Sequence, residues 1–141
     1  MIDRDLQIKK KSPIINDNKK NNTIIFHSSR DKKKINYFRS KGIKLSYIEL
    51  DVYNRINLKS VFSKVYNNGI SSILIEGGKS LTKSLLRDKL INEFYLFKSK
   101  KNLGKFGKKN IYDFKKKIIV FLKKKENIKT FLDRDKITRY Y

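Results

Sequence analysis

The fold is decided by one stretch of the sequence, Ser72-Ile73-Leu74-Ile75-Glu76-Gly77-Gly78-Lys79-Ser80-Leu81-Thr82. Its apolar beginning predicts a buried strand, and the residues from Ser80 to Leu86 predict the start of a helix. The two glycines between them let the backbone turn and come close to a ligand. Because a helix N-terminus presents free N–H groups and a partial positive charge, this turn is a predicted anion site.

Several residues of this stretch have two interpretations. Glu76 stands at the carboxyl end of the predicted strand, where open α/β sheets bind ligands, but it can equally be a capping carboxylate for nearby N–H groups. Lys79 is either a phosphate clamp or a solvent-exposed lysine. The glycine pair also suits an ordinary tight turn. An NTPase is disfavoured, because Ile73 stands where the phosphate loop ending in Gly-Lys-Ser requires its first glycine.

The composition limits the class of protein. With 141 residues, of which 38% are hydrophobic, the chain suits one domain with a core of its own. The absence of cysteine excludes disulfides, zinc–thiolate sites and cysteine nucleophiles. No apolar run is long enough for a membrane span, and the acidic and basic residues at positions 3–5 are unlike a signal peptide. We therefore expect a soluble, cytoplasmic protein without a metal site or a membrane partner.

The net charge of +23 suggests a nucleic-acid partner, because lysines that neutralise phosphates bind any sequence. The lysines, however, are spread along the whole chain, without an RNA-binding aromatic signature or a zinc-ligand spacing. We interpret them as a solvated surface whose positive field helps a phosphorylated small ligand approach. A catalytically inactive basic module with affinity for polyanions or nucleic acid is the alternative.

Predicted strands and helices alternate along the first two thirds of the chain. We expect strands at 23–26, 43–50, 72–75 and 94–97, the first short and apolar and the last two buried. Between them lie a helix that carries Ile35 and Phe38 and ends at Gly42, a helix capped by Asn57 that ends at Gly69, and a helix with Leu81 and Leu85 on one face. Three successive strand–helix units predict parallel pairing with right-handed crossovers.

The pattern changes in the last third. We expect surface loops at 7–22 and 98–110, an apolar run at 118–122, and a terminal hairpin whose arms, 129–132 and 137–141, flank a turn at 133–135. The predicted fold class is α/β, a single domain over 1–141. Its mixed sheet is mainly parallel with an antiparallel C-terminal hairpin, and helices cover both faces.

A family resemblance rests on four segments: 69–78, with its Glu-Gly-Gly ending, the pair Leu85-Leu86, residues 90–96, and the pair Leu103-Gly104. Together they resemble the C-terminal reductase domain of the bifunctional riboflavin-biosynthesis deaminase/reductase, which has a dihydrofolate-reductase-like fold. The opening segment, Ile2 to Leu6, is similar to the strand and turn that precede a variable loop in that family.

The resemblance implies a function. Reductases of this family use NADPH to reduce 5-amino-6-(5-phosphoribosylamino)uracil, with hydride going to the ribosyl C1′ so that the sugar opens into a ribityl chain. It implies that Glu76 contacts the phosphorylated pyrimidine substrate. It also implies that the cofactor is bound by Gly77, Gly78, Lys79, Ser80, Leu81, Thr82, Lys83 and Ser84, with Asp3 and Arg4 approaching from the neighbouring strand end. No catalytic residue is assigned.

The chain also departs from the family. The likeness begins in the middle of the reductase domain, so we expect an N-terminally truncated domain that lacks part of the nicotinamide site. A homodimer and a separate deaminase domain or chain are its possible partners. Lys89 stands where the family has a helix-ending glycine, and Lys100 where it has a proline, so both loops should differ locally.

The turn after the first predicted strand also has two interpretations. Ser28, Ser29 and Arg30 either hold the 2′-phosphate of NADPH or form an ordinary helix cap, and we favour the cap. His27, the single histidine, is interpreted as a surface or capping residue rather than a proton donor.

Overall fold

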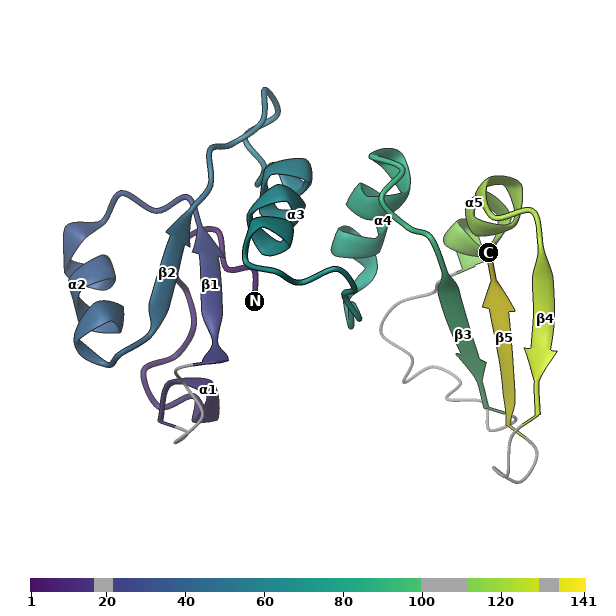
Figure 1. Ribbon diagram of the computed structural model, residues 1–141, viewed down its shortest axis with the longest axis horizontal. Helices are drawn as coiled ribbons and strands as arrows, with labels where there is room; N and C mark the ends of the chain where they lie inside the picture. Colours follow the sequence, from purple (N-terminus) through teal and green to yellow (C-terminus); the bar gives the residue numbers. More distant parts are fainter. Residues whose placement is uncertain (17–21, 100–111, 130–134) are drawn as a thin grey trace. The chain divides into compact units, whose positions relative to one another are not determined.

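The computed structural model describes residues 1–16, 22–99, 112–129 and 135–141. The described chain divides into two compact units, residues 1–72 and 73–141 (Figure 1). The first unit contains α1 (Pro13–Asn16), β1 (Ile24–His27), α2 (Lys32–Ser40), β2 (Lys44–Tyr47) and α3 (Leu58–Asn67). The second contains α4 (Lys79–Arg87), β3 (Phe94–Lys98), α5 (Tyr112–Phe121), β4 (Lys125–Ile128) and β5 (Lys136–Tyr140).

The first unit is built around the parallel pair β1 and β2, which α2 connects (Figure 1). The register runs from Ile24 opposite Lys44 to His27 opposite Tyr47. One face of this pair packs on α1 and α2 through a buried cluster of Leu6, Ile15, Ile25, Phe38 and Ile43. The predicted first strand and the predicted helix with Phe38 are thereby confirmed. The helix ends just before Gly42, whose φ of 77° is a conformation that glycine adopts more easily than residues with a side chain.

Helix α3 begins and ends as its sequence predicts. The side chain of its N-cap residue, Asn57, accepts a hydrogen bond of 3.1 Å from the N–H of Ser60. Leu58 and Val61 are buried, and Gly69 follows the helix with a φ of 80°. Both signals act within a few residues of the helix end, which is why the sequence alone reveals them.

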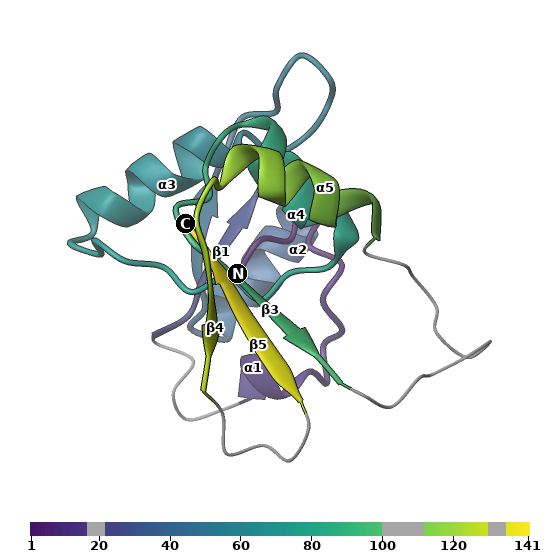
Figure 2. The same ribbon diagram turned by 90° about the vertical axis from the view of Figure 1, so that its right-hand side faces the viewer.

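The second unit is an antiparallel sheet of β3, β5 and β4, in that order, with α4 and α5 on one face (Figure 2). Its core contains Ile118, Leu122 and Tyr140, against which Leu86 and Phe94 pack. The predicted terminal hairpin is confirmed as the antiparallel pair β4 and β5. Its first arm begins at 125 rather than 129, and residues 130–134 lie outside the described part. Residues 118–122 lie at the end of α5 and just after it.

The prediction of one mainly parallel sheet is wrong, although the mixed α/β class is confirmed. Within the described residues, the parallel and antiparallel strands belong to two separate sheets. The predicted strand at 72–75 has no regular secondary structure, and Leu74 is 85% exposed. A strand requires partners for its backbone, and no described strand pairs with this segment. Strand β3 is also less buried than predicted, because Phe97 on its outer face is 68% exposed.

The predicted loop at 7–22 contains a short helix and a core residue. Pro13 occupies the first helical position, where its missing N–H costs nothing, and Ile15 in the same helix is fully buried. Residues 17–21 lie outside the described part, as do 100–110 of the predicted loop at 98–110, whose first residue, Lys98, ends β3. No helix that the structure describes has the length and apolar character needed to cross a membrane.

Candidate functional site

The turn before α4 is open to solvent. Glu76, Gly77 and Gly78 are all exposed, and Gly78 is the N-cap residue of the helix. No side chain makes a capping hydrogen bond there, and no acidic residue lies in the first turn. A glycine N-cap has no side chain to offer as an acceptor for the N–H groups that begin α4.

The two glycines of this turn serve different purposes. A Cβ atom added at Gly77 would lie 3.0 Å from Leu81 Cδ2, so the close packing of Leu81 explains this glycine. At Gly78 an added Cβ would meet nothing within 4 Å. Its φ of −77° and ψ of 175° are also open to any residue. The tight-turn interpretation therefore gives no reason for glycine at position 78.

Helix α4 is anchored on its opposite face, so the open turn stands on a fixed element. Leu85 is buried, and Leu86 packs against the core of the second unit. The helix ends at Asp88, after which Lys89 has a φ of 55°. Lys89 thus adopts the left-handed conformation that a helix-ending glycine would adopt. A lysine in this conformation has a steric cost that glycine does not have.

The other predicted cofactor residues of α4 lie along its first two turns. Ser80 and Lys83 are exposed, whereas Lys79, Thr82 and Ser84 are half-buried. Thr82 closes the first turn: its N–H and its Oγ1 lie 3.2 and 3.3 Å from the carbonyl oxygen of Gly78. Its hydroxyl proton is therefore used within the helix, which leaves its oxygen as an acceptor.

Asp3 and Arg4, in the first unit, have partners of their own. Both carboxylate oxygens of Asp3 accept backbone N–H groups, from Gln7 at 2.9 Å and Ile8 at 2.8 Å. The Arg4 guanidinium forms an ion pair of 2.7 Å with Asp5 and donates to the carbonyl oxygen of Asn54. Arg4 also joins the end of β1, since its carbonyl oxygen accepts the N–H of Ser28. These side chains hold the segment after residue 2 in place.

The N-terminus of α2 is closed by a residue that the sequence analysis did not single out. The carboxylate of Asp31 accepts the N–H groups of Lys33 and Lys34, at 2.9 and 3.2 Å. The helix cap is therefore Asp31 rather than Ser28 or Ser29. The signal was present in the sequence, because an aspartate directly before a helical run is a typical N-cap.

His27 is buried, which corrects its interpretation as a surface or capping residue. Only 3% of it is exposed, and its ring meets that of Tyr47 edge to face at 5.9 Å between centroids. Burial lowers the pKa of the imidazole, so the ring is neutral at pH 7. Its Nδ1 has no hydrogen-bond partner within the described residues.

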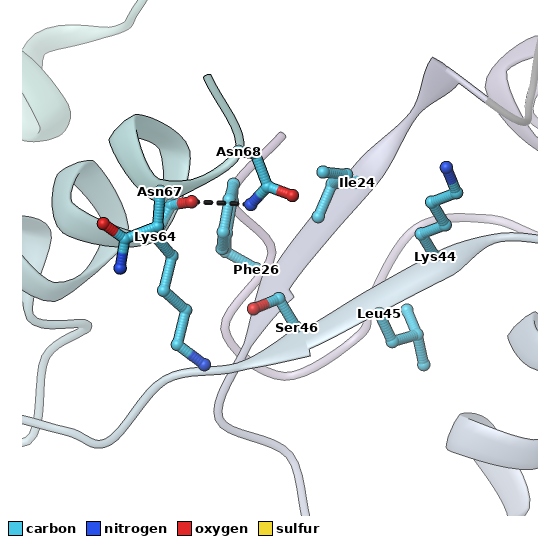
Figure 3. Close-up of a pocket in the computed structure, with 8 residues that line it drawn as sticks. All are labelled: Ile24, Phe26, Lys44, Leu45, Ser46, Lys64, Asn67 and Asn68. Carbon is cyan, nitrogen blue, oxygen red and sulfur yellow. Dashed lines mark hydrogen bonds between the residues drawn. The ribbon is translucent and has the colours of Figure 1, made fainter. Parts of the chain in front are cut away.

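A shallow groove of about 300 Å³ lies on the face of the β1–β2 pair toward the end of α3 (Figure 3). Its polar side chains include Ser46, Lys64 and Asn68, and the amide of Asn68 donates to the carbonyl oxygen of Lys64 at 2.6 Å. It contains none of the residues that the sequence predicts for the site.

The described elements define a mixed α/β protein in which side chains cap the starts of α2 and α3, whereas α4 starts after a glycine. The chain belongs to the family of RibD C-terminal domains, which matches residues 1–129. A search among curated proteins gave no match. The family consists of riboflavin-pathway reductase domains, its fold is dihydrofolate-reductase-like, and its reductases use NAD(P)H. The predicted resemblance is confirmed.

Proposed function

We propose that this chain is an NADPH-dependent reductase domain that acts on 5-amino-6-(5-phosphoribosylamino)uracil, with the open turn before α4 as its cofactor diphosphate site. Membership of the RibD C-terminal domain family supports the reaction class. The observation that carries the assignment of the site is the N-terminus of α4, whose N-cap residue, Gly78, makes no side-chain hydrogen bond. An oxidised or reduced nicotinamide dinucleotide carries a diphosphate, which is the kind of anion that such a helix start binds.

The residues of the turn fit this group. The space at Gly78 that a Cβ would occupy is empty, so a phosphate can approach the main chain there. No carboxylate lies in the first turn of α4 to repel it. Ser80 is exposed at the same helix end and adds a hydroxyl donor. When bound, the cofactor supplies the hydride, and the part of the protein is to hold and orient the two ligands.

Glu76 is the residue we propose for the substrate. It is exposed directly before the glycine turn, so its carboxylate is available to a ligand beside the cofactor. A carboxylate accepts hydrogen bonds from the N–H and O–H groups of a pyrimidine or a sugar. Asp3 and Arg4 remain cofactor residues on the family resemblance alone, because their side chains are already paired within the first unit.

The variant Gly78→Leu tests the site with little risk to the fold. The residue has an ordinary backbone conformation and an added Cβ meets no atom, so leucine is compatible with the structure. It would, however, occupy the space that the diphosphate needs. In a fluorescence titration with NADPH we expect the dissociation constant to rise by about tenfold or more, which is ~1.4 kcal/mol of binding free energy.

Asn92→Leu is the matched control, because Asn92 is an exposed residue of the same unit. It should bind NADPH as the unchanged protein does. Equal affinity in Gly78→Leu and the unchanged protein would refute the cofactor site. Turnover of the uracil substrate with NADPH, followed at the nicotinamide absorbance, then tests the reaction itself, and Glu76→Gln should raise the KM for that substrate.

A further inference from the structure

A second hollow of the first unit is lined by lysines and by no carboxylate. It has a volume of about 340 Å³ and lies between residues 6–10 and α2. Its lining residues are Leu6, Gln7, Ile8, Lys9, Lys10, Lys33, Lys34, Tyr37 and Phe38. The buried side chains of Leu6 and Phe38 fix its floor, since both belong to the core of the unit. The cationic rim therefore stands on a rigid base.

The acidic residues near this hollow are already engaged elsewhere. Asp31 accepts the N–H groups that begin α2, and Asp3 accepts those of Gln7 and Ile8. Asp5 forms an ion pair with Arg4. None of the three lines the hollow. Four positive charges thus share one concave surface without an acidic group among its lining residues, which gives it a positive potential that attracts anions.

Two of the four lysines are held in place. Lys34 Nζ donates to the carbonyl oxygen of Asp5 at 2.9 Å, and Lys10 Nζ lies 4.8 Å from the centre of the Tyr37 ring. Lys9 and Lys33 are exposed and form no ion pair with any other described residue. The hollow therefore combines two lysines that are held by contacts, Lys10 and Lys34, with two exposed lysines whose side chains can move to contact a ligand.

We propose that this hollow binds a small anion with two or more phosphate groups. A phosphate monoester carries about −1.5 to −2 charges near neutral pH, so two such groups match the four lysines. Lysine binds phosphate as a compact point charge and does not require one fixed geometry. The size of the hollow suits a compact ligand rather than a polymer that would follow the lysines along the chain.

Calorimetric titration of the whole chain with inorganic tripolyphosphate tests the proposal at about 0.15 M salt, where exposed charges more than ~8 Å apart are largely screened. We expect saturable binding at one site. The double variant Lys9→Gln/Lys33→Gln should weaken it by about tenfold or more, and Lys9→Arg/Lys33→Arg should retain most of the affinity. ATP as a second ligand distinguishes recognition of the phosphates alone, which gives equal affinities, from added contacts to the base, which make ATP the tighter ligand.

The control removes two charges from the same unit outside the hollow. Lys41 and Lys59 are exposed and line neither hollow of the first unit, so Lys41→Gln/Lys59→Gln should change the affinity less than about twofold. Equal losses in the two glutamine variants would show general charge attraction and overturn the proposal. An equal loss in Gly78→Leu would place the anion at the turn before α4 and also overturn it. Much tighter binding of a ten-nucleotide single strand, lost in Lys9→Gln/Lys33→Gln, would assign the hollow to nucleic acid instead.

Discussion

Helices α2 and α4 have the same length but differ in the residue that caps their N-termini. Helix α2 is closed by the carboxylate of Asp31, which accepts two backbone N–H groups. Helix α4 begins after Gly78, an N-cap residue that makes no side-chain capping hydrogen bond. A side-chain cap stabilises a helix but occupies the groups that would bind an anion. The first helix start is thus capped by a side chain that serves the fold, whereas the second has no such cap, and we propose it as the ligand site.

Both helices are held by a buried apolar residue, so the difference between them lies at their N-terminal ends. Phe38 anchors α2 and Leu85 anchors α4, and both are almost fully buried. We expect Phe38→Ala to lower the free energy of unfolding by about 3–5 kcal/mol and Leu85→Ala by about 2–5 kcal/mol, because each leaves a cavity. Urea denaturation followed by circular dichroism measures both. A loss below ~1 kcal/mol for either variant would show that its helix is not docked as described.

Closing the open helix start should separate binding from stability. Gly78→Asp places a carboxylate where α2 has Asp31, so we expect the free energy of unfolding to rise by a few tenths of a kcal/mol. The same carboxylate would compete with the diphosphate and repel it, and NADPH should bind about tenfold more weakly or worse. Unchanged NADPH affinity in this variant would break the contrast between the two helices.

Opening the closed helix start is the reverse change. Asp31→Ala leaves the N–H groups of Lys33 and Lys34 without their acceptor. We expect a loss of about 1 kcal/mol in the free energy of unfolding, measured by thermal or urea denaturation. Asp88→Ala serves as the comparison: it removes an aspartate from the C-terminal end of α4, so no N-cap is lost. A neutral result for Asp31→Ala would mean that its capping bonds do not stabilise α2.

The C-termini of the helices give the smallest effect. Helix α3 is followed by Gly69 and α4 by Lys89, both with positive φ. Only the lysine pays a steric cost in that conformation, so Lys89→Gly should stabilise the protein by about 0.5–1 kcal/mol. Gly69→Ala, measured in the same denaturation assay, should destabilise it by a similar amount. Destabilisation by Lys89→Gly would indicate that the lysine side chain has a stabilising contact.

These helix ends also show what the sequence can and cannot predict. Asn57 and Gly69 were identified correctly, because a cap acts on the residues next to it. The strand at 72–75 was predicted from its apolar residues, but a strand forms only where another strand accepts its backbone hydrogen bonds. That requirement involves residues far away in the sequence, and no local pattern contains it.

The candidate site divides in the same way. The glycine turn and the start of α4 follow from a short motif, and both were predicted. The burial of His27 and the closure of α2 by Asp31 were missed, although the second had a local signal. The lysine-lined hollow brings residues 6–10 together with α2, across more than twenty residues of chain, so only the fold reveals it.

The most direct test of the open helix start is a titration followed by NMR of the ¹⁵N-labelled chain. It reports on the backbone N–H groups of Gly77, Gly78, Lys79 and Ser80 themselves. If these groups bind the diphosphate, their resonances should shift saturably with NADPH and not with reduced nicotinamide mononucleotide, which lacks the diphosphate bridge. The N–H groups of Lys33 and Lys34, which Asp31 already occupies, should remain unchanged. Saturable NADPH binding that leaves the four resonances of the turn unmoved would contradict the account.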